Sequence, residues 1–398
     1  MKAYIFPGQG AQYKGMGEGL FKHYPDLVQQ ADEILGYSVV ELCLEDPLHQ
    51  LGFTQFTQPA LYVVNALSYR LETDTTGVLP DYLAGHSLGE YNALEASGAI
   101  SFEDGVRLVK KRGVLMRQAP KGAMAAILGS NEDEITQLLT SNNLSAIDIA
   151  NYNSPDQTVI SGLVEDIAKA EAVFSGSNIK FIPLNTSGAF HSRYMESAKR
   201  EFTKYLNHFE FLPLTIDVIS NVDAKPYSNN TIADNLASQI VRSVRWSESV
   251  AYMMNKGVTE FNELGVGNIL STLIEKMQAQ LMQAQLKQDD SKVPHGVDAI
   301  NDTSVFKPSA QSARKTATAG TASAAVADGA PDTEQLSKVV DDWNDTYPIG
   351  TKVSVNHHPD ILETRTEAMM LFDRKATVYM KGYKGYFDLV DVRPINTE

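Results

Sequence analysis

The chain has 398 residues, 43% hydrophobic and 21% charged, which is long enough for a large core and for more than one domain. Its 34 basic and 49 acidic residues give a formal net charge of −15, which argues against general affinity for nucleic acid or anionic membranes. Cys43 is the single cysteine, which excludes an internal disulfide and fits a reducing cytoplasm.

Membrane and secretory signals are not expected. The N-terminal segment Met1–Phe6 reaches a Pro-Gly turn too early to contain the apolar region of a signal peptide, and no run of 18 apolar residues occurs. We therefore expect a cytoplasmic protein without a membrane partner.

Strand and helix patterns alternate up to about residue 283, which predicts an α/β fold. The predicted strands cover 4–6, 124–128, 148–151, 157–161, 180–184, 215–219 and 258–263, and a further strand leads into Gly85. The predicted helices cover 18–35, 38–50, 57–72, 102–118, 131–141, 163–174, 194–206, 231–241 and 247–256, with another after Gly89.

The segment 122–186 has its own order of elements, β-α-β-β-α-β, which is typical of a ferredoxin-like subdomain. We expect it to form a lid on a larger α/β body made of residues 1–121 and 187–283.

Ser87 lies in the sequence Gly85-His86-Ser87-Leu88-Gly89, between an apolar strand and a helix. Glycines on both sides of the serine permit the sharp turn of a nucleophile elbow, and a helix N-terminus favours negative charge nearby. Such glycines also serve ordinary strand-to-helix turns, so this motif alone leaves both interpretations open.

Three further positions are candidate partners for Ser87. Arg112 shares helical spacing with Leu108 and Leu115, so it points to an apolar face and needs an anion, either a carboxylate of the protein or one of a substrate. A snorkelling side chain is the other structural interpretation. His191 follows a loop and is the obvious base, although a lone histidine is more often structural. Gln9, between two glycines, lies in a loop suited either to backbone contacts with a ligand or to a tight turn.

The C-terminal region has a different composition. Residues 284–335 are rich in Ala, Ser, Thr, Asp and Gly and predict a flexible linker. Residues 336–398 contain short alternating segments at 351–355, 369–373, 376–380 and 385–392, which predict a small, mostly-β domain resembling an SH3-like barrel. We hypothesise that it is a docking module for a partner protein. The isolated pair His357-His358 is weak support for a metal site, and none is predicted.

Several blocks occur in order and together resemble malonyl-CoA:acyl carrier protein transacylases, especially the free-standing acyltransferases of polyketide synthases. The resemblance covers about 1–283 and implies an α/β-hydrolase-like body with a ferredoxin-like subdomain. The blocks are FPGQGAQ at 6–12, TQPAL at 57–61, GHSLGEYNAL at 85–94, RGVLM at 112–116, NSPDQTVISG at 153–162, GAFHSRYM at 188–195, SNVDAKPY at 220–227, VRW at 244–246 and ELGVGNIL at 263–270.

The resemblance implies a role for each matching position. Ser87 matches the acyl-accepting nucleophile, and His191 matches the base, which a main-chain carbonyl at Gln239 orients. The backbone amides of Gln9 and Leu88 match the oxyanion hole, and Arg112 matches the receptor for the malonyl carboxylate. The remaining matches concern the pocket: Phe190, Asn153 and His86.

The implied reaction is ping-pong transfer of malonyl from malonyl-CoA, through Ser87, to the phosphopantetheine thiol of an acyl carrier protein or carrier domain. No permanently bound cofactor is implied. Phe190 before His191 is the form of the motif that accompanies malonyl rather than methylmalonyl in this family. Two alternatives stay open: a proofreading acyl hydrolase on the same fold, against which Arg112 argues, and a non-catalytic scaffold, against which the intact set of Ser87, His191 and Arg112 argues.

Overall fold

The computed structural model describes residues 1–176, 179–290, 333–348, 350–356, 361–364, 368–371, 375–380 and 386–395. The chain divides into two compact units, residues 1–294 and 295–398. No helix in the described parts of the chain is long and apolar enough to cross a membrane.

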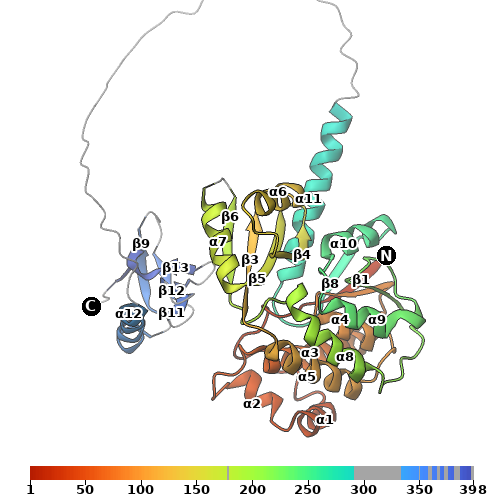
Figure 1. The fold of residues 1–398 in the computed structure, drawn as a ribbon. Helices are drawn as coiled ribbons and strands as arrows, with labels where there is room; N and C mark the ends of the chain where they lie inside the picture. The colour runs from red at the N-terminus through yellow and green to blue at the C-terminus, as the bar shows by residue number, and fades with distance from the viewer. Residues whose placement is uncertain are drawn as a thin grey trace, which may run out of the picture. The chain divides into compact units, whose positions relative to one another are not determined.

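A four-stranded parallel sheet forms the centre of the first unit (Figure 1). Its strand order is β7-β2-β1-β8, so the first strand lies inside the sheet. Strands that are buried on both faces have continuous apolar sequences. Strand β1 is such a strand, because Ala3 to Phe6 are apolar and fully buried. The strands are β1 (Lys2–Phe6), β2 (Tyr82–Gly85), β7 (Asp217–Ile219) and β8 (Glu260–Glu263).

Helices surround this sheet, and α3 packs along α5. The α-helices of this body are α1 (Pro25–Leu35), α2 (Val39–Leu44), α3 (Thr54–Thr76), α4 (Gly89–Ala96), α5 (Phe102–Gln118), α8 (Glu196–Leu206), α9 (Ile232–Gln239), α10 (Trp246–Asn255) and α11 (Ile269–Asp290). Two short 3₁₀ helices, η1 (Arg193–Met195) and η2 (Asn229–Thr231), precede α8 and α9.

Some predicted helix bounds are wrong. The helix expected at 18–35 begins only at Pro25, because Gly17 and Gly19 have positive φ angles in a run of turns. The helix expected at 38–50 ends at Leu44. Helix α11 was not predicted, although Leu270, Leu273, Ile274 and Met277 are buried at helical spacing.

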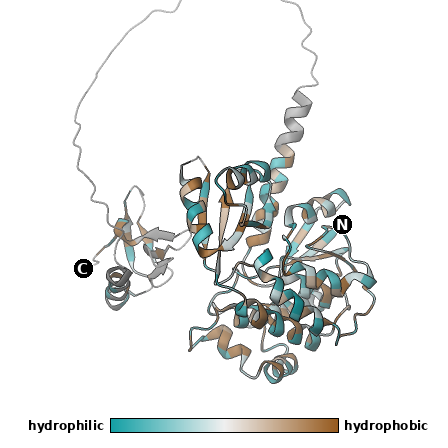
Figure 2. Ribbon diagram, viewed as in Figure 1, coloured by the Kyte–Doolittle hydropathy of each residue, from teal (hydrophilic) through white to brown (hydrophobic). Residues whose placement is uncertain are grey.

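The second sheet of this unit is antiparallel, with strand order β4-β5-β3-β6, and has two helices (Figure 1). This is the β-α-β-β-α-β order expected from the sequence, so parallel and antiparallel sheets together establish the α/β class. The inner strand β3 is mostly brown in Figure 2, since GAMAAIL has no polar side chain. The elements are β3 (Gly122–Leu128), α6 (Glu132–Ser141), β4 (Asp148–Ser154), β5 (Gln157–Leu163), α7 (Val164–Ser175) and β6 (Lys180–Leu184).

Backbone bridges join the antiparallel sheet to the body at two places besides the chain itself. Lys121 and Gly188, the two connecting segments, form an antiparallel bridge. The amide of Val244 donates to Ala150 O at 2.8 Å, and Val244 O accepts from the amide of Tyr152 at 2.9 Å. These bonds fix β4 against the body.

The described residues of the second unit form the α-helix α12, the short 3₁₀ helix η3 and two three-stranded antiparallel sheets, ordered β10-β9-β14 and β11-β12-β13. The fully buried Val353, Val378 and Met380 belong to its core. Its elements are α12 (Thr333–Thr346), β9 (Lys352–Val355), β10 (Leu362–Glu363), β11 (Met369–Leu371), β12 (Lys375–Tyr379), β13 (Tyr386–Asp388), η3 (Leu389–Asp391) and β14 (Val392–Pro394).

The linker predicted at 284–335 is therefore wrong at both ends, where α11 extends to Asp290 and α12 begins at Thr333. In α12, Val340 and Trp343 pack on the core three residues apart, a helical spacing that the adjacent polar tract masked. The rest of the predicted linker, 291–332, and the pair His357-His358 lie outside the described residues.

Two glycines shape the turn between β2 and α4. A side chain at Gly85 would meet the carbonyl carbon of Gly89 at 1.9 Å, and one at Gly89 would meet Phe6 O at 2.1 Å. Both positions need a residue without Cβ, because backbone atoms cannot give way as a flexible side chain can.

We predict that Gly89→Ala lowers the free energy of unfolding by at least about 2 kcal/mol, since its Cβ overlaps the backbone of β1. Gly52→Ala is the matched control, because no heavy atom lies within 4 Å of a Cβ there and its φ is not positive. Urea unfolding of both variants measures the effect; equal midpoints for the two would contradict it.

Candidate active site

Ser87 stands in the sharp turn between β2 and α4, with a φ of 52° that non-glycine residues seldom adopt. Such strain persists only where the surroundings over-determine it. Here the amide of Ser87 donates to Asn221 Oδ1 at 2.7 Å, and Asn221 Nδ2 donates to Gly85 O at 2.7 Å. Asn221 thus braces both sides of the turn that presents the hydroxyl.

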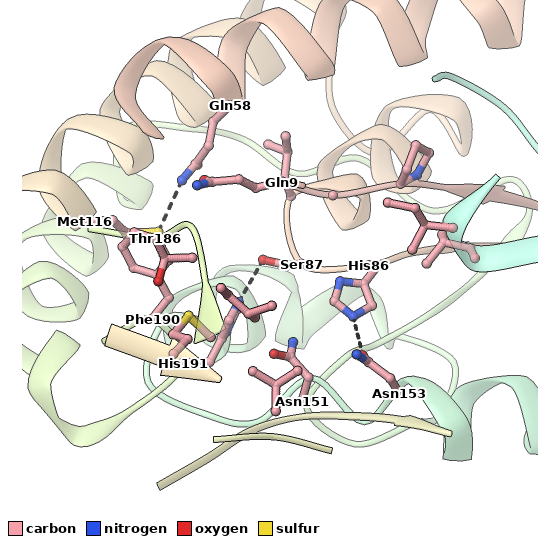
Figure 3. A pocket seen from close by; sticks show the side chains of 18 of the residues that line it. Gln9, Gln58, His86, Ser87, Met116, Asn151, Asn153, Thr186, Phe190 and His191 are labelled. Atoms are coloured by element: carbon pink, nitrogen blue, oxygen red, sulfur yellow. Dashed lines mark hydrogen bonds between the residues drawn. The ribbon is translucent and has the colours of Figure 1, made fainter. Parts of the chain in front are cut away.

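The imidazole of His191 forms a hydrogen bond with Ser87, as Figure 3 shows. Ser87 Oγ lies 2.7 Å from His191 Nε2, and Nδ1 donates to the main-chain carbonyl of Gln239 at 2.8 Å. The carbonyl can only accept, so Nδ1 carries the proton and Nε2 is free to take one from the serine. Burial, helped by the Arg112 charge, lowers the pKa of His191 to about 3, so the ring is neutral at pH 7.

Arg112 is fully buried and directs its guanidinium toward the same serine. Its Nη2 donates to Ser87 Oγ at 3.1 Å and to Gln239 Oε1 at 2.8 Å, while Nη1 donates to Gln58 Oε1 at 2.8 Å. The guanidinium carbon lies 5.6 Å from the centre of the Tyr91 ring. None of the salt bridges among the described residues involves Arg112. Neutral groups hold it, so the interpretation as a buried ion pair does not hold.

Gln9 and Leu88 line the pocket beside Ser87, on the loop after β1 and on the turn into α4. Among the hydrogen bonds of the described residues, none has the backbone amide of either residue as donor. Gln9 Oε1 accepts from Thr54 Oγ1 at 2.5 Å, which ties the loop to the start of α3. Two amides without a protein acceptor next to a nucleophile can stabilise an oxyanion.

The pocket around these groups has a volume of about 170 Å³ and lies between the two sheets of the first unit (Figure 3). Ser87, His191 and Arg112 form its polar end. Phe190, 5% exposed, belongs to its apolar wall. The other apolar lining residues are Met116, Met124, Val159, Leu184, Ile269, Leu270 and Leu273.

His86 and Asn153 form a separate pair at the edge of the pocket. His86 Nε2 donates to Asn153 Oδ1 at 2.9 Å, and its ring packs edge-to-face on Trp246 with centroids 5.7 Å apart. Burial lowers the pKa of His86, so it stays neutral. His86 therefore has a structural role, packing on Trp246 and binding Asn153, and the hydrogen bond of Asn153 joins β4 to the elbow.

Three residues that contact the site were not singled out from the sequence: Gln58, Glu90 and Asn221. All three lie inside motif blocks, TQPAL, GHSLGEYNAL and SNVDAKPY. The available signal was Glu90, an acidic residue only three positions after the candidate nucleophile Ser87 in the same block.

Metal ligation has no candidate in the described parts of the chain, where no group of three or more His, Cys, Asp or Glu side chains could hold an ion.

The acyl transferase domain family matches residues 3–287. The polyketide biosynthesis malonyl CoA-acyl carrier protein transacylase BaeC of Bacillus velezensis is 53% identical over 279 residues, which cover 70% of this chain and 96% of that protein. Residues 288–398 lie outside the family match.

Solved structures are similar over the same region. A malonyl CoA-acyl carrier protein transacylase from Burkholderia pseudomallei aligns with a TM-score of 0.69 and 48% identity, covering 70% of this chain and 98% of that one. A malonyl-transacylase solved in complex with its type II polyketide synthase acyl carrier protein aligns with a TM-score of 0.66 and 33% identity, covering 69% and 92%.

The family match covers well over half of the chain, and BaeC is matched over almost its whole length. The chain therefore belongs to the malonyl-CoA:acyl carrier protein transacylases of the acyl transferase domain family.

Proposed function

We propose that this protein transfers malonyl from malonyl-CoA to the phosphopantetheine thiol of an acyl carrier protein and thereby supplies extender units for polyketide synthesis. The observation that carries this proposal is the buried guanidinium of Arg112, 3.1 Å from Ser87 Oγ and free of any salt bridge among the described residues. An acyl group that ends in a carboxylate would pair with it while its other end reaches the serine.

The first half-reaction forms the acyl-serine. His191 Nε2 takes the proton of Ser87 Oγ as the oxygen attacks the thioester carbonyl, and the amides of Gln9 and Leu88 hold the developing oxyanion. When the intermediate collapses, the C–S bond breaks and the thiolate of coenzyme A leaves with the proton from His191. Malonyl then remains as an ester on Ser87.

The second half-reaction runs the same steps with a different thiol. The phosphopantetheine thiol of the carrier gives its proton to His191 and attacks the ester carbonyl. The C–O bond to Ser87 breaks, and the serine recovers the proton. One base thus serves both halves of a ping-pong cycle, and no bound cofactor is needed.

The pocket also limits the acyl group. The buried ring of Phe190 lies next to His191 in the pocket wall. It would fill the space that an α-methyl substituent needs, so we expect malonyl to be favoured over methylmalonyl. A proofreading hydrolase for uncharged acyl chains has no use for the Arg112 charge, which argues against this alternative.

Residues 1–121 and 187–283 would form the α/β-hydrolase-like catalytic body and 122–186 a ferredoxin-like lid. Residues 336–398 would form a small β-barrel-like domain that docks the enzyme on a synthase partner. The expected location is the cytoplasm. The relative that was solved with its carrier protein supports a carrier as partner.

We predict that Ser87→Ala abolishes covalent labelling by radiolabelled malonyl-CoA, because the ester forms on Ser87 Oγ. Acid-quenched protein, separated from free label, measures it. A chase of the labelled wild-type protein with holo carrier protein or with buffer separates transfer from hydrolysis. Normal labelling of the alanine variant would refute the acyl-serine mechanism.

For Arg112→Ala we expect malonyl loading to lose about 2–4 kcal/mol of transition-state stabilisation while acetyl loading is retained. The ratio of kcat/KM for malonyl-CoA and acetyl-CoA, measured for both proteins, gives this value. Arg117 is an exposed arginine on the same helix, so Arg117→Ala is the control. Its preference for malonyl-CoA over acetyl-CoA should equal that of the wild type. An unchanged ratio in the Arg112 variant would rule out its role as carboxylate receptor.

Deletion of 336–398 should leave loading from malonyl-CoA unchanged and slow transfer to the carrier domain of the cognate synthase. Transfer to a free-standing carrier protein serves as the control and should not change. The docking hypothesis is abandoned if the shortened protein serves the synthase as fast as the full chain does.

A further inference from the structure

Glu90 lies on α4, three residues after Ser87, and is fully buried. Carboxylates are seldom buried without a cationic partner, and none of the salt bridges among the described residues involves Glu90. Three neutral donors bind it instead: the amide of Asn221 at 2.7 Å and Tyr227 OH at 2.8 Å, both to Oε1, and Gln239 Nε2 to Oε2. Because burial of this charge is costly, we expect the contacts that hold Glu90 to have a function.

The first role concerns Gln239. Its Nε2 donates to Glu90 and to Ser87 O at 2.8 Å, and its Oε1 accepts from Arg112. The amide cannot turn over, because Oε1 would then face the carboxylate and Nε2 would face the guanidinium. Since the carbonyl of the same residue orients His191, Glu90 fixes the residue on which both the base and the carboxylate receptor depend.

The second role concerns the elbow. Glu90 Oε1 accepts from the backbone amide of Asn221, whose side chain holds the amide of Ser87 and the carbonyl of Gly85. The strained φ of Ser87 is therefore braced by a residue that Glu90 anchors.

We propose that Glu90 is the positioning residue that holds nucleophile, base and carboxylate receptor in one arrangement, through Asn221 and Gln239. The inference rests on the proposed malonyl transfer. It assigns Glu90 no contact with substrate, since the carboxylate acts only through these two residues.

Charge supports the assignment. Burial raises the pKa of Glu90 to about 7, although its hydrogen bonds and the Arg112 charge act in the opposite direction. The other titratable groups around it are Tyr91 and Tyr227, whose pKa values burial raises, and His191, whose pKa is about 3. Of these groups, only Glu90 gains its charge near pH 7. Loading should therefore fall as the pH drops through about 7.

Glu90→Gln is the central test, because it keeps the shape and replaces one acceptor oxygen by a donor. If the new amide nitrogen takes the place of Oε2, Gln239 Nε2 loses its acceptor, and if it takes the place of Oε1, both the amide of Asn221 and Tyr227 OH lose theirs. We expect kcat for malonyl loading to be about 10–100-fold lower than in the wild type, as for a misplaced reacting group. The decrease in loading that the wild type shows below pH 7 should be absent in this variant. The unfolding midpoint at pH 8 should be unchanged or higher, because folding raises the pKa of Glu90 from 4.5 to about 7. The resulting penalty on the fold is absent below about pH 4.5, grows between 4.5 and 7 and is complete at pH 8.

Glu95→Gln is the matched control, since Glu95 is a second buried carboxylate on α4 but pairs with Arg70, away from the pocket. It should keep the wild-type kcat and lose stability. A Glu90→Gln variant with wild-type kcat, or one that loses only stability, would overturn the inference. Failure of the wild-type protein to load malonyl would instead refute the proposed function.

Tyr227→Phe tests the same inference if Glu90→Gln does not fold. The phenol lowers the pKa of Glu90 by donating a hydrogen bond to it, so its removal should shift the fall in loading to higher pH. A pH profile identical to that of the wild type would show that Glu90 does not control loading.

Discussion

The rest of the site depends on a positive charge that is buried without a carboxylate beside it. Arg112 is held by two amide oxygens, the serine hydroxyl and the face of an aromatic ring. These contacts give Nη1 and Nη2 hydrogen-bond acceptors, but Nε has none among the described residues and the guanidinium is not neutralised. Transfer of a charge out of water is costly. An acyl group that ends in a carboxylate would offset that cost by pairing with the guanidinium. Substrate choice therefore depends directly on the burial of Arg112.

The fold makes this arrangement possible through close packing of α3 and α5. A Cβ at Gly113, next to Arg112, would come within 3.0 Å of Gln55 Cα and of Thr54 O. The close approach brings Gln58 of α3 within hydrogen-bond distance of the guanidinium. The same part of α3 holds the Gln9 side chain through Thr54, so one helix supports both the carboxylate receptor and the loop of the oxyanion hole.

Much of the site could be predicted from the sequence, because its chemistry resides in local patterns. The glycines around Ser87 predicted the elbow, and the helical spacing of Arg112 predicted its inward direction. The main-chain carbonyl of Gln239 was expected only from the family resemblance, since a backbone contact leaves no pattern in the sequence. Glu90, Asn221 and Gln58 were missed for a similar reason: their partners in the site lie 54 to 149 positions away, and only the folded chain brings them together. Helix α12 was missed because a long polar tract lies before it.

The most direct test of the account is to offer the protein equal amounts of malonyl-CoA and acetyl-CoA and to identify the modified peptides by mass spectrometry. The account predicts that the peptide containing Ser87 carries malonyl in large excess over acetyl. Equal amounts of the two acyl groups on this peptide, or an acyl group on another residue, would contradict it.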